Sequence, residues 1–559
     1  MHRHHHHHTQ REGPLDPEVE ERNREEDHLL KLWTLEAGRR LLNDSRPTRP
    51  TNRNAVKAQL TQLNHQLHQL SKKRLEPHTN ELIASIAQVV AMKMLLTYWL
   101  FPINNLPVEL LQHIMSIATT SQPFSQISRT RIRLASVCKR WRSAAIGMSS
   151  LWSVIRVTEQ PPFPLTQICL QRAGSQLISI CVDQRKPNWS GLEDDHRLQP
   201  KDMQSLIAYI TKGFSQVREL SILADTWAVI TAAEQVLQRV PSPRSLQRLE
   251  IRRTGSAYVR FEPSGAAPEG VRIPVRLFGG AQAPMLNHLT LNGVYADFRS
   301  SSFRNLRVLE MRKMATEQMP NMKDFYPVLE GSPYLEKLTF HCACPTLTGP
   351  EDYSIWEDAE VKLTYLRELA LCDLLPFYAM FLVRLISAPN LQRLRLERIH
   401  NPDDMDVNEL ITELCYKPRD KLTELVVYDL VCNDIPMIAS WIGRTSVRRL
   451  RVGKVPDAFF IALTRRIKAP PVSARDRQLG LRSVCPWLET FEVPTWDGIS
   501  FLTFQMFCVE RNESLRSLVI GQKVWDALRE EEREWLSQSR TRRLQVVPQR
   551  FFEEKDEFE

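Results

Sequence analysis

Twelve copies of one short apolar pattern constrain the fold of this chain more than any other feature. The pattern is Leu-x-x-Leu-x-Leu, and successive copies start 20 to 41 residues apart. Its last two apolar positions alternate, as in a short strand with one buried face, and the intervals leave room for a helix that covers the sheet. Stacked units bury a core that a single unit lacks, so the pattern predicts an α/β solenoid. The copies begin at Leu177, Val217, Leu246, Leu286, Leu306, Leu335, Leu366, Leu391, Leu422, Val447, Leu488 and Leu515.

The repeated units resemble an irregular leucine-rich repeat, which is a horseshoe of parallel strands with helices on the outer face. We assign the resemblance to residues 164–522. The period is uneven and no regular Asn follows the strand, so the curvature is not predicted. An ordinary α/β domain with crossover helices is the alternative. The long intervals after Ile251 and after Val452 have room for inserted strands or loops.

A second constraint lies upstream, between Leu106 and Trp152. Pro107 suits the first turn of a helix, and Glu109 carries the charge that a helix N-terminus favours. Apolar residues then recur at helical spacing, and after a polar loop over 119–131 they recur again. Two short amphipathic helices are expected, and about fifty residues cannot bury both apolar faces. The apolar positions are Leu110, Leu111, Ile114, Met115 and Ala118, then Leu134, Val137, Cys138 and Trp141.

This stretch resembles the F-box, because LPxELLxxI, then LxxVCxxW, then the Leu-Trp pair at 151–152 occur in the family's order. The loop between the two signatures is longer than usual, as in fungal members of the family. The resemblance implies a three-helix module over residues 101–157 that docks on a Skp-type adaptor of a cullin ubiquitin ligase. A buried helix pair that caps a larger domain is the alternative. The adaptor-binding residues it implies are Leu106, Pro107, Leu110, Leu111, Ile114, Met115, Leu134, Val137, Cys138 and Trp141.

The composition is that of a soluble globular protein with two to four folding units. The chain has 559 residues, of which 42% are hydrophobic and 25% charged, and its formal charge is +9. Such a charge over this length does not by itself indicate nucleic acid. Ten cysteines are scattered singly, which is typical of a reduced compartment, so we expect a cytoplasmic or nuclear protein.

The flanking segments have their own signatures. Residues 1–54 form a charged arm, expected to be mostly disordered, that starts with the histidine run 4–8. Residues 55–100 are expected to be helical, with Leu60, Leu63, Leu67 and Leu70 in a short coiled-coil-like spacing. Residues 82–100 are long and apolar enough to cross a bilayer, although Lys93 inside the span favours a buried helix. Residues 523–559 are expected to form a capping helix and an acidic tail.

Catalytic motifs are largely absent from the sequence. The chain has no phosphate-binding loop, no dinucleotide-binding glycine pattern, no HExxH and no GxSxG. His341, Cys342 and Cys344 suggest half of a metal site, but the other half is missing and strand alternation would turn both thiols the same way. We therefore expect no enzyme activity, no cofactor and no metal.

On each predicted strand, every second side chain faces solvent. Together these side chains form a surface where a protein partner can bind. Twelve strands at 4.8 Å spacing would make a surface about 50 Å long. Arginine and tyrosine dominate interface hot spots, and arginine pairs with carboxylate or phosphate. We expect an acidic or phosphorylated substrate segment here, unless Glu397 and Glu424 simply balance a solvated charged face. The candidate substrate-binding residues are Arg393, Arg395, Tyr428, Arg449 and Arg451.

Together these patterns indicate a substrate receptor of a cullin-type ubiquitin ligase. Its expected partners are a Skp-type adaptor, through it a cullin, and an unidentified protein substrate, with no nucleic acid and no membrane. The competing hypothesis is a repeat scaffold without a ligase, either unattached or associated with a membrane through residues 82–100. A nucleic-acid binder is favoured only by the pI of about 9.0.

Overall fold

The computed structural model divides into two compact units, residues 1–117 and 118–559, and the boundary falls inside helix α4 (Val108–Thr120). The structure describes residues 28, 30–40, 53–72, 80–100, 103, 106–186, 198–254, 273–299, 303–314, 318–347, 356, 358–399, 407–417, 420–472, 474–497, 499–511, 514–538 and 543–552. The histidine run and the acidic tail after 552 lie outside these residues, as does most of the predicted N-terminal arm, in which residues 30–40 are helical.

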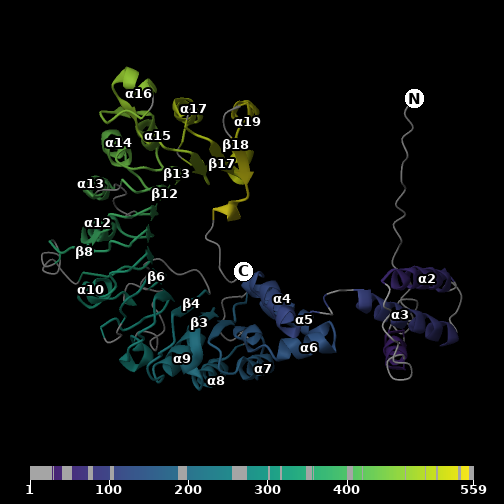
Figure 1. Ribbon diagram of the computed structural model, residues 1–559. Helices are drawn as coiled ribbons and strands as arrows, with labels where there is room; N and C mark the ends of the chain where they lie inside the picture. The colour runs from purple at the N-terminus through teal and green to yellow at the C-terminus, as the bar shows by residue number, and fades with distance from the viewer. Residues whose placement is uncertain are drawn as a thin grey trace, which may run out of the picture. The chain divides into compact units, whose positions relative to one another are not determined.

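In the first unit, helix α2 (Arg53–Lys72) packs against helix α3 (Asn80–Leu100) (Figure 1). The leucines of the coiled-coil-like spacing are half-buried, and Val56 and Ala87 are buried. Within α3, the stretch Asn80–Thr97 is long and apolar enough to cross a membrane, yet only 22% of it is buried. The expectation that this helix packs on the neighbouring module stays a prediction.

The second unit is organised around one parallel sheet. Its strands are ordered β1-β2-β3-β4-β5-β6-β7-β9-β11-β12-β13-β16-β17-β18, so the chain adds each main strand beside the one before it. This arrangement is the predicted α/β solenoid. The strands are β1 (Val154–Val157), β2 (Ile178–Asp183), β3 (Val217–Ala224), β4 (Arg248–Arg253), β5 (His288–Asn292), β6 (Val308–Arg312), β7 (Lys337–His341), β9 (Glu368–Cys372), β11 (Arg393–Glu397), β12 (Glu424–Tyr428), β13 (Arg449–Gly453), β16 (Thr490–Val493), β17 (Ser517–Gly521) and β18 (Arg543–Val547).

Strand pairing follows the sequence pattern residue by residue. The middle leucine of one copy pairs with the middle leucine of the next, as Leu249 does with Leu220 and Leu289, and the last apolar residues pair in the same way. Both ladders are almost completely buried, because side chains two residues apart share one face of the sheet. All twelve copies of the pattern coincide with a strand of this sheet.

Helices cover the sheet on the side of the buried leucines. In Figure 1 the helices from α9 to α14 lie along the outer side of the curved stack, with the strands inside it. Neighbouring helices pack on one another, as α12 does on α13 and α13 on α14. The helices are α7 (Pro164–Ala173), α8 (Pro200–Thr211), α9 (Trp227–Leu237), α10 (Met322–Glu330), α12 (Pro376–Leu385), α13 (Asn408–Tyr416), α14 (Ile435–Gly443), α15 (Asp457–Thr464), α16 (Ala474–Leu479), α17 (Phe501–Glu510), α18 (Gln522–Ala527) and α19 (Glu530–Ser537).

The sheet is longer at both ends than the sequence pattern indicates. Strand β1 lies within the stretch assigned to the F-box, and β18 follows two short helices where a single capping helix was expected. The long interval after Val452 does contain inserted strands, β14 (Arg466–Ile467) and β15 (Arg482–Ser483), which pair antiparallel. A further parallel pair joins β8 (Val361–Lys362) and β10 (Ile386–Ser387).

A recurrent turn follows the central strands. At the ends of six strands, the residue directly after the strand has a φ between 47° and 54°. This conformation is unfavourable for residues other than glycine. In the first five of these turns the backbone N–H donates to the last carbonyl of the following strand, as from Asp373 to Glu397 at 2.8 Å, so the hydrogen-bond ladder continues through the turn. The turn stacks polar side chains beside the sheet. These residues are Lys313, Cys342, Asp373, Arg398, Asp429 and Lys454.

Candidate functional site

Helix α4 begins where the sequence predicts it. Leu111 N–H donates to Pro107 O at 3.1 Å, which closes the first turn. The helix has two apolar sides with different environments, because Leu111 and Met115 are fully buried, whereas Leu110 is 51% exposed and Ile114 is also exposed. Leu110 and Ile114 therefore offer apolar surface to another molecule, as do Val108 and Ile117 on the same helix.

The second predicted helix is in fact two helices. Helix α5 (Phe124–Ser136) starts inside the expected loop over 119–131, and α6 (Lys139–Ile146) starts after a break at Val137 and Cys138. Cys138 has extended backbone angles, φ −161° and ψ 174°, so the apolar spacing spans the break instead of a continuous helix. Val137 is 57% exposed at the end of α5, whereas Trp141 on α6 is buried.

Arg131, which the sequence pattern placed at the end of a polar loop, is a buried side chain of α5. Its guanidinium donates to Leu151 O at 3.2 Å and Val154 O at 3.1 Å, and it lies 4.8 Å from the ring of Trp152. Burial lowers the pKa of Arg131. Trp152 in turn donates from its indole nitrogen to Ala145 O at 2.7 Å. Arg131 thus joins α5 to the segment that leads into β1.

The structure therefore divides the ten adaptor-binding residues that the sequence implied. Leu111, Met115 and Trp141 are buried and form no accessible surface, which corrects the expectation for these three. Their positions on the inner sides of α4 and α6 explain the difference, since a short helix needs a buried side to hold its place. The residues that keep at least partial exposure are Leu106, Pro107, Leu110, Ile114, Leu134, Val137 and Cys138.

The candidate substrate-binding residues lie on three adjacent strands. The register places Arg395 on β11 opposite Val426 on β12, which lies opposite Arg451 on β13. Arg393, Glu424 and Arg449 form the next row in the same way, and Tyr428 lies at the end of β12. The structure thus brings these residues together on one face of the sheet.

Each of the four arginines is paired with a carboxylate of this chain. Arg393 contacts Glu368 at 2.7 Å and Glu424 at 2.6 Å, and Arg395 contacts Glu397 at 2.7 Å. Arg449 and Arg451 both bind Glu492, at 2.6 and 2.7 Å, and Glu492 is fully buried. Sequence patterns did not single out Glu492, because β16 follows β13 only after a long insertion. The balanced charged face is therefore the better description of the rows from β9 to β13.

Not every side chain on this face of the sheet is exposed. Three glutamates are buried, namely Glu250 on β4, Glu310 on β6 and Glu397 on β11. Charged neighbours cover them, as Arg252 covers Glu250 and Arg312 covers Glu310. The face is consequently a network of ion pairs with few isolated cations or anions among the described residues.

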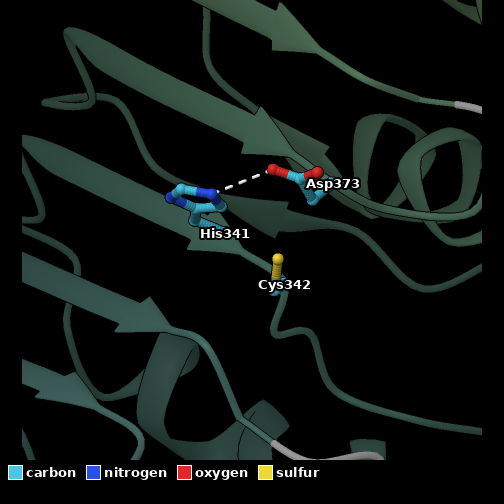
Figure 2. Close-up of side chains that lie close together, drawn as sticks. All are labelled: His341, Cys342 and Asp373. Carbon is cyan, nitrogen blue, oxygen red and sulfur yellow. Dashed lines mark ion pairs between the residues drawn. The ribbon is translucent and has the colours of Figure 1, made fainter. Parts of the chain in front are cut away.

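A second cluster joins His341, Cys342 and Asp373 at the ends of β7 and β9 (Figure 2). Their potential ligand atoms lie within 4.8 Å of one another, and His341 Nε2 is 2.9 Å from Asp373 Oδ2. Arg398 also holds both carboxylate oxygens of Asp373, at 2.7 and 2.5 Å. The carboxylate is thus already bound by a cation, which disfavours a metal ion. Cys344, the third residue of the expected half-site, is buried elsewhere in the fold.

The cysteines have the environment of core residues. All ten are free thiols, and most are buried. Burial raises the pKa of Cys344 and Cys372 to about 12, so neither is a thiolate at neutral pH. The alternation argument for Cys342 and Cys344 does not apply, because β7 ends at His341 and Cys342 lies in the recurrent turn.

The fold and the site define a class of protein in which a small helical module is followed by a long parallel sheet covered by helices. Residues 103–157 match the family described as F-box-like, and this stretch contains α4, α5, α6 and the first strand of the sheet. The chain thus contains an F-box-like domain, a type of domain that generally binds Skp-type adaptors within cullin complexes. No curated protein matches the chain.

Proposed function

We propose that this chain is the substrate-recognition subunit of a Skp-cullin-F-box type ubiquitin ligase. The observation that carries the proposal is the F-box-like domain at residues 103–157, whose helices keep Leu110, Ile114 and Val137 exposed. Large apolar side chains at a protein surface commonly mark an interface. The sheet face of the second unit, with leucine-rich-repeat-like units behind it, supplies the surface for a protein substrate.

The contribution of the chain to ubiquitin transfer is proximity. A substrate held by the second unit and an adaptor held by the F-box-like domain are joined through one polypeptide, so the substrate lysine meets the charged conjugating enzyme at a high effective concentration. The chain itself supplies no catalytic group in this proposal, and it needs no cofactor or metal. A cytoplasmic or nuclear location and a fungal type of F-box protein remain parts of the proposal.

Co-purification with a Skp-type adaptor tests the adaptor half of the proposal. Leu110→Asp and Val137→Asp place charges on exposed apolar positions, so each is expected to abolish capture without changing the thermal melting of the chain. Leu502→Asp is a matched control, because Leu502 is 68% exposed on α17, outside the F-box-like domain. Unchanged adaptor capture by both F-box variants would contradict the proposal.

Helix α3 supports a second candidate function, in which a repeat scaffold is attached to a membrane without a ligase. Most of its apolar stretch is not buried, although Lys93 lies within it. Carbonate extraction of the expressed chain distinguishes the two candidates. A membrane-spanning α3 keeps the chain in the pellet, and a ligase subunit without a membrane span is recovered in the supernatant.

A further inference from the structure

Helix α17 is apolar on its outer side as well as on its inner side. The inner side, which includes Phe504 and Phe507, is buried against the core. On the opposite side three apolar residues at helical spacing form one row, and each is more than half exposed: Leu502, Met506 and Val509. A helix that is apolar all round is normally buried, because an exposed apolar row favours contact with another surface. The described residues of this chain leave the outer row of α17 uncovered.

Helix α15 lies beside α17 and runs in the same direction (Figure 1). Before α17, Ser500 N–H donates to Asp457 Oδ1 at the start of α15, at 2.7 Å. After α17, the buried guanidinium of Arg511 donates to Leu463 O near the end of α15, at 2.6 Å. Ile461 on α15 is exposed and adds to the apolar surface. The two helices thus form one firmly held surface, the outer helix pair, which consists of residues 457–464 and 501–510.

The outer helix pair has a basic end, at the C-termini of its two helices. The hairpin of β14 and β15 lies at this end, because Arg466 forms ion pairs with Asp476 and with Glu510 in the last turn of α17. Among the described residues, five cations and two carboxylates give this end a net charge of +3: Arg465, Arg466, Lys468, Arg477 and Arg482, with Asp476 and Glu510. Three of the cations, Arg465, Lys468 and Arg477, are exposed and form no ion pair within the described part of the chain.

The other end, where both helices begin, is acidic. Trp535 on α19 packs there against Phe501, the first residue of α17, with ring centres 5.9 Å apart. Residues 522–537 carry five carboxylates and three cations, and Asp457 and Asp497 lie at the starts of the two outer helices. Seven carboxylates against three cations give these groups a net charge of −4. The outer helix pair is therefore polarised along its length.

A second copy of the chain, turned end over end, matches both features. When two α17 helices pack antiparallel about a two-fold axis near Met506, Leu502 of each copy lies opposite Val509 of the other. The basic end of each copy then lies opposite the acidic end of the other, and symmetry makes the two charge contacts identical. A parallel pair would bring like charges together. Both the apolar row and the charge distribution therefore favour an antiparallel pair of copies.

The surface is large enough for a reversible dimer. Helix α17 has ten residues and is about 15 Å long, and two helices side by side are about 20 Å wide. With about 10 Å at each charged end, the contact covers roughly 700 Å² per copy, close to the roughly 800 Å² per partner of a standard protein interface. Its apolar centre is small, so we expect dissociation in the micromolar range.

We propose that the outer helix pair binds a second copy of this chain, through antiparallel α17 helices and reciprocal contacts between the β14–β15 hairpin and α19. The inference goes beyond the proposed function and does not depend on it, because the exposed residues of the F-box-like domain take no part. The dimer carries two sheet faces, so a partner with two matching segments is bound more tightly by the dimer than by the monomer.

Sedimentation velocity of the full chain tests the proposal at concentrations from about 1 to about 20 µM. The unaltered chain is expected to change from monomer to dimer over this range. Met506→Asp places two like charges against each other near the axis and is expected to leave the chain monomeric. Met285→Asp, at an exposed methionine before β5, is the matched control and is expected to dimerise as the unaltered chain does. A chain that stays monomeric, or a dimer that Met506→Asp leaves intact, overturns the proposal.

Charge reversal tests the antiparallel arrangement. One variant replaces the three exposed cations of the hairpin: Arg465→Glu, Lys468→Glu and Arg477→Glu. A second variant replaces three exposed glutamates of α19: Glu530→Lys, Glu531→Lys and Glu534→Lys. Each variant alone is expected to dimerise about tenfold more weakly or worse, since both its ends carry the same sign. An equal mixture of the two is expected to form a heterodimer within about threefold of the natural affinity. Variants that dimerise normally, or a mixture that does not associate, contradict the proposed contact.

Other occupants of this surface give different results. If vesicles of equal parts phosphatidylcholine and phosphatidylserine sediment the unaltered chain but not Met506→Asp, the surface belongs to a membrane and the proposal is overturned. The same holds if Met506→Asp abolishes capture of the Skp-type adaptor, whereas equal capture with loss of the dimer is expected. Thermal melting shows whether each variant is folded. If Met506→Asp melts early, the mixture of charge-reversed variants decides the outcome.

Discussion

Glu234 gives the sharpest test of the energetics of this fold. It lies on α9 and is 4% exposed, and its Oε1 has no hydrogen-bond partner among the described residues. Burial without a compensating charge raises the pKa of Glu234 to about 8. The folded chain therefore holds this carboxyl in its neutral form at neutral pH, while the unfolded chain ionises it.

The pKa difference sets the size and sign of the effect. Since the folded-state pKa lies above the unfolded value of 4.5, unfolding releases a proton between these two values and stability falls as the pH rises. At pH 7 the loss amounts to about 3 kcal/mol, and at pH 5 to about 1 kcal/mol. Glu234→Gln keeps the shape and removes the ionisation, so the variant gains this amount relative to the natural chain.

Thermal melting of the full chain at pH 5 and pH 7 measures the difference. For a unit of about 440 residues, 3 kcal/mol corresponds to about 3 °C in melting temperature, so Glu234→Gln is expected to melt about 3 °C higher at pH 7 and about 1 °C higher at pH 5. Glu330→Gln, at an exposed glutamate of α10, serves as the control and is expected to change neither value. A difference that stays constant with pH refutes the reasoning.

Three other outcomes are expected. Arg131→Met leaves Leu151 O and Val154 O without their donor, which costs about 1–3 kcal/mol for each unpaired carbonyl, and the variant is expected to melt earlier and to lose adaptor capture. Addition of Zn²⁺ is expected to leave the melting temperature unchanged, because Arg398 already holds Asp373; a shift that His341→Ala removes would contradict this. Gly521→Val is expected to lower the melting temperature, since even a Cβ would lie 2.7 Å from Pro494 O, and unchanged melting would show that the strand end can relax.

The leucine pattern predicted the twelve central strands correctly because each strand is specified locally. Alternating apolar residues must face the core, and a shift of one residue would expose all of them. The edge strands β1 and β18 were not predicted, because their sequences lack the strong apolar alternation of the central strands. They are less buried or shorter, and their backbone pairs with a strand that is already in place, so their own sequences need no strong alternation.

The helices of the F-box-like domain were located less accurately. The spacing of Leu134 and Trp141 fits a continuous helix, yet the chain breaks at Cys138 and begins α5 earlier, at Phe124. Apolar periodicity does not reveal a helix break when the apolar residues before and after the break keep helical spacing. The role of Arg131 was equally invisible, because its partners Leu151 and Val154 lie twenty or more residues further along the chain.

The amino-acid sequence by itself determined the α/β architecture, the F-box-like segment and the rows in which charged residues stand on the sheet. Only the tertiary structure decided which of those residues are accessible. Strand stacking pairs Arg449 and Arg451 with Glu492, and chain reversal after β18 brings Phe552 to Arg451. Periodicity arises from neighbours along the chain, whereas ion pairing and burial arise from segments that meet only when the chain has folded.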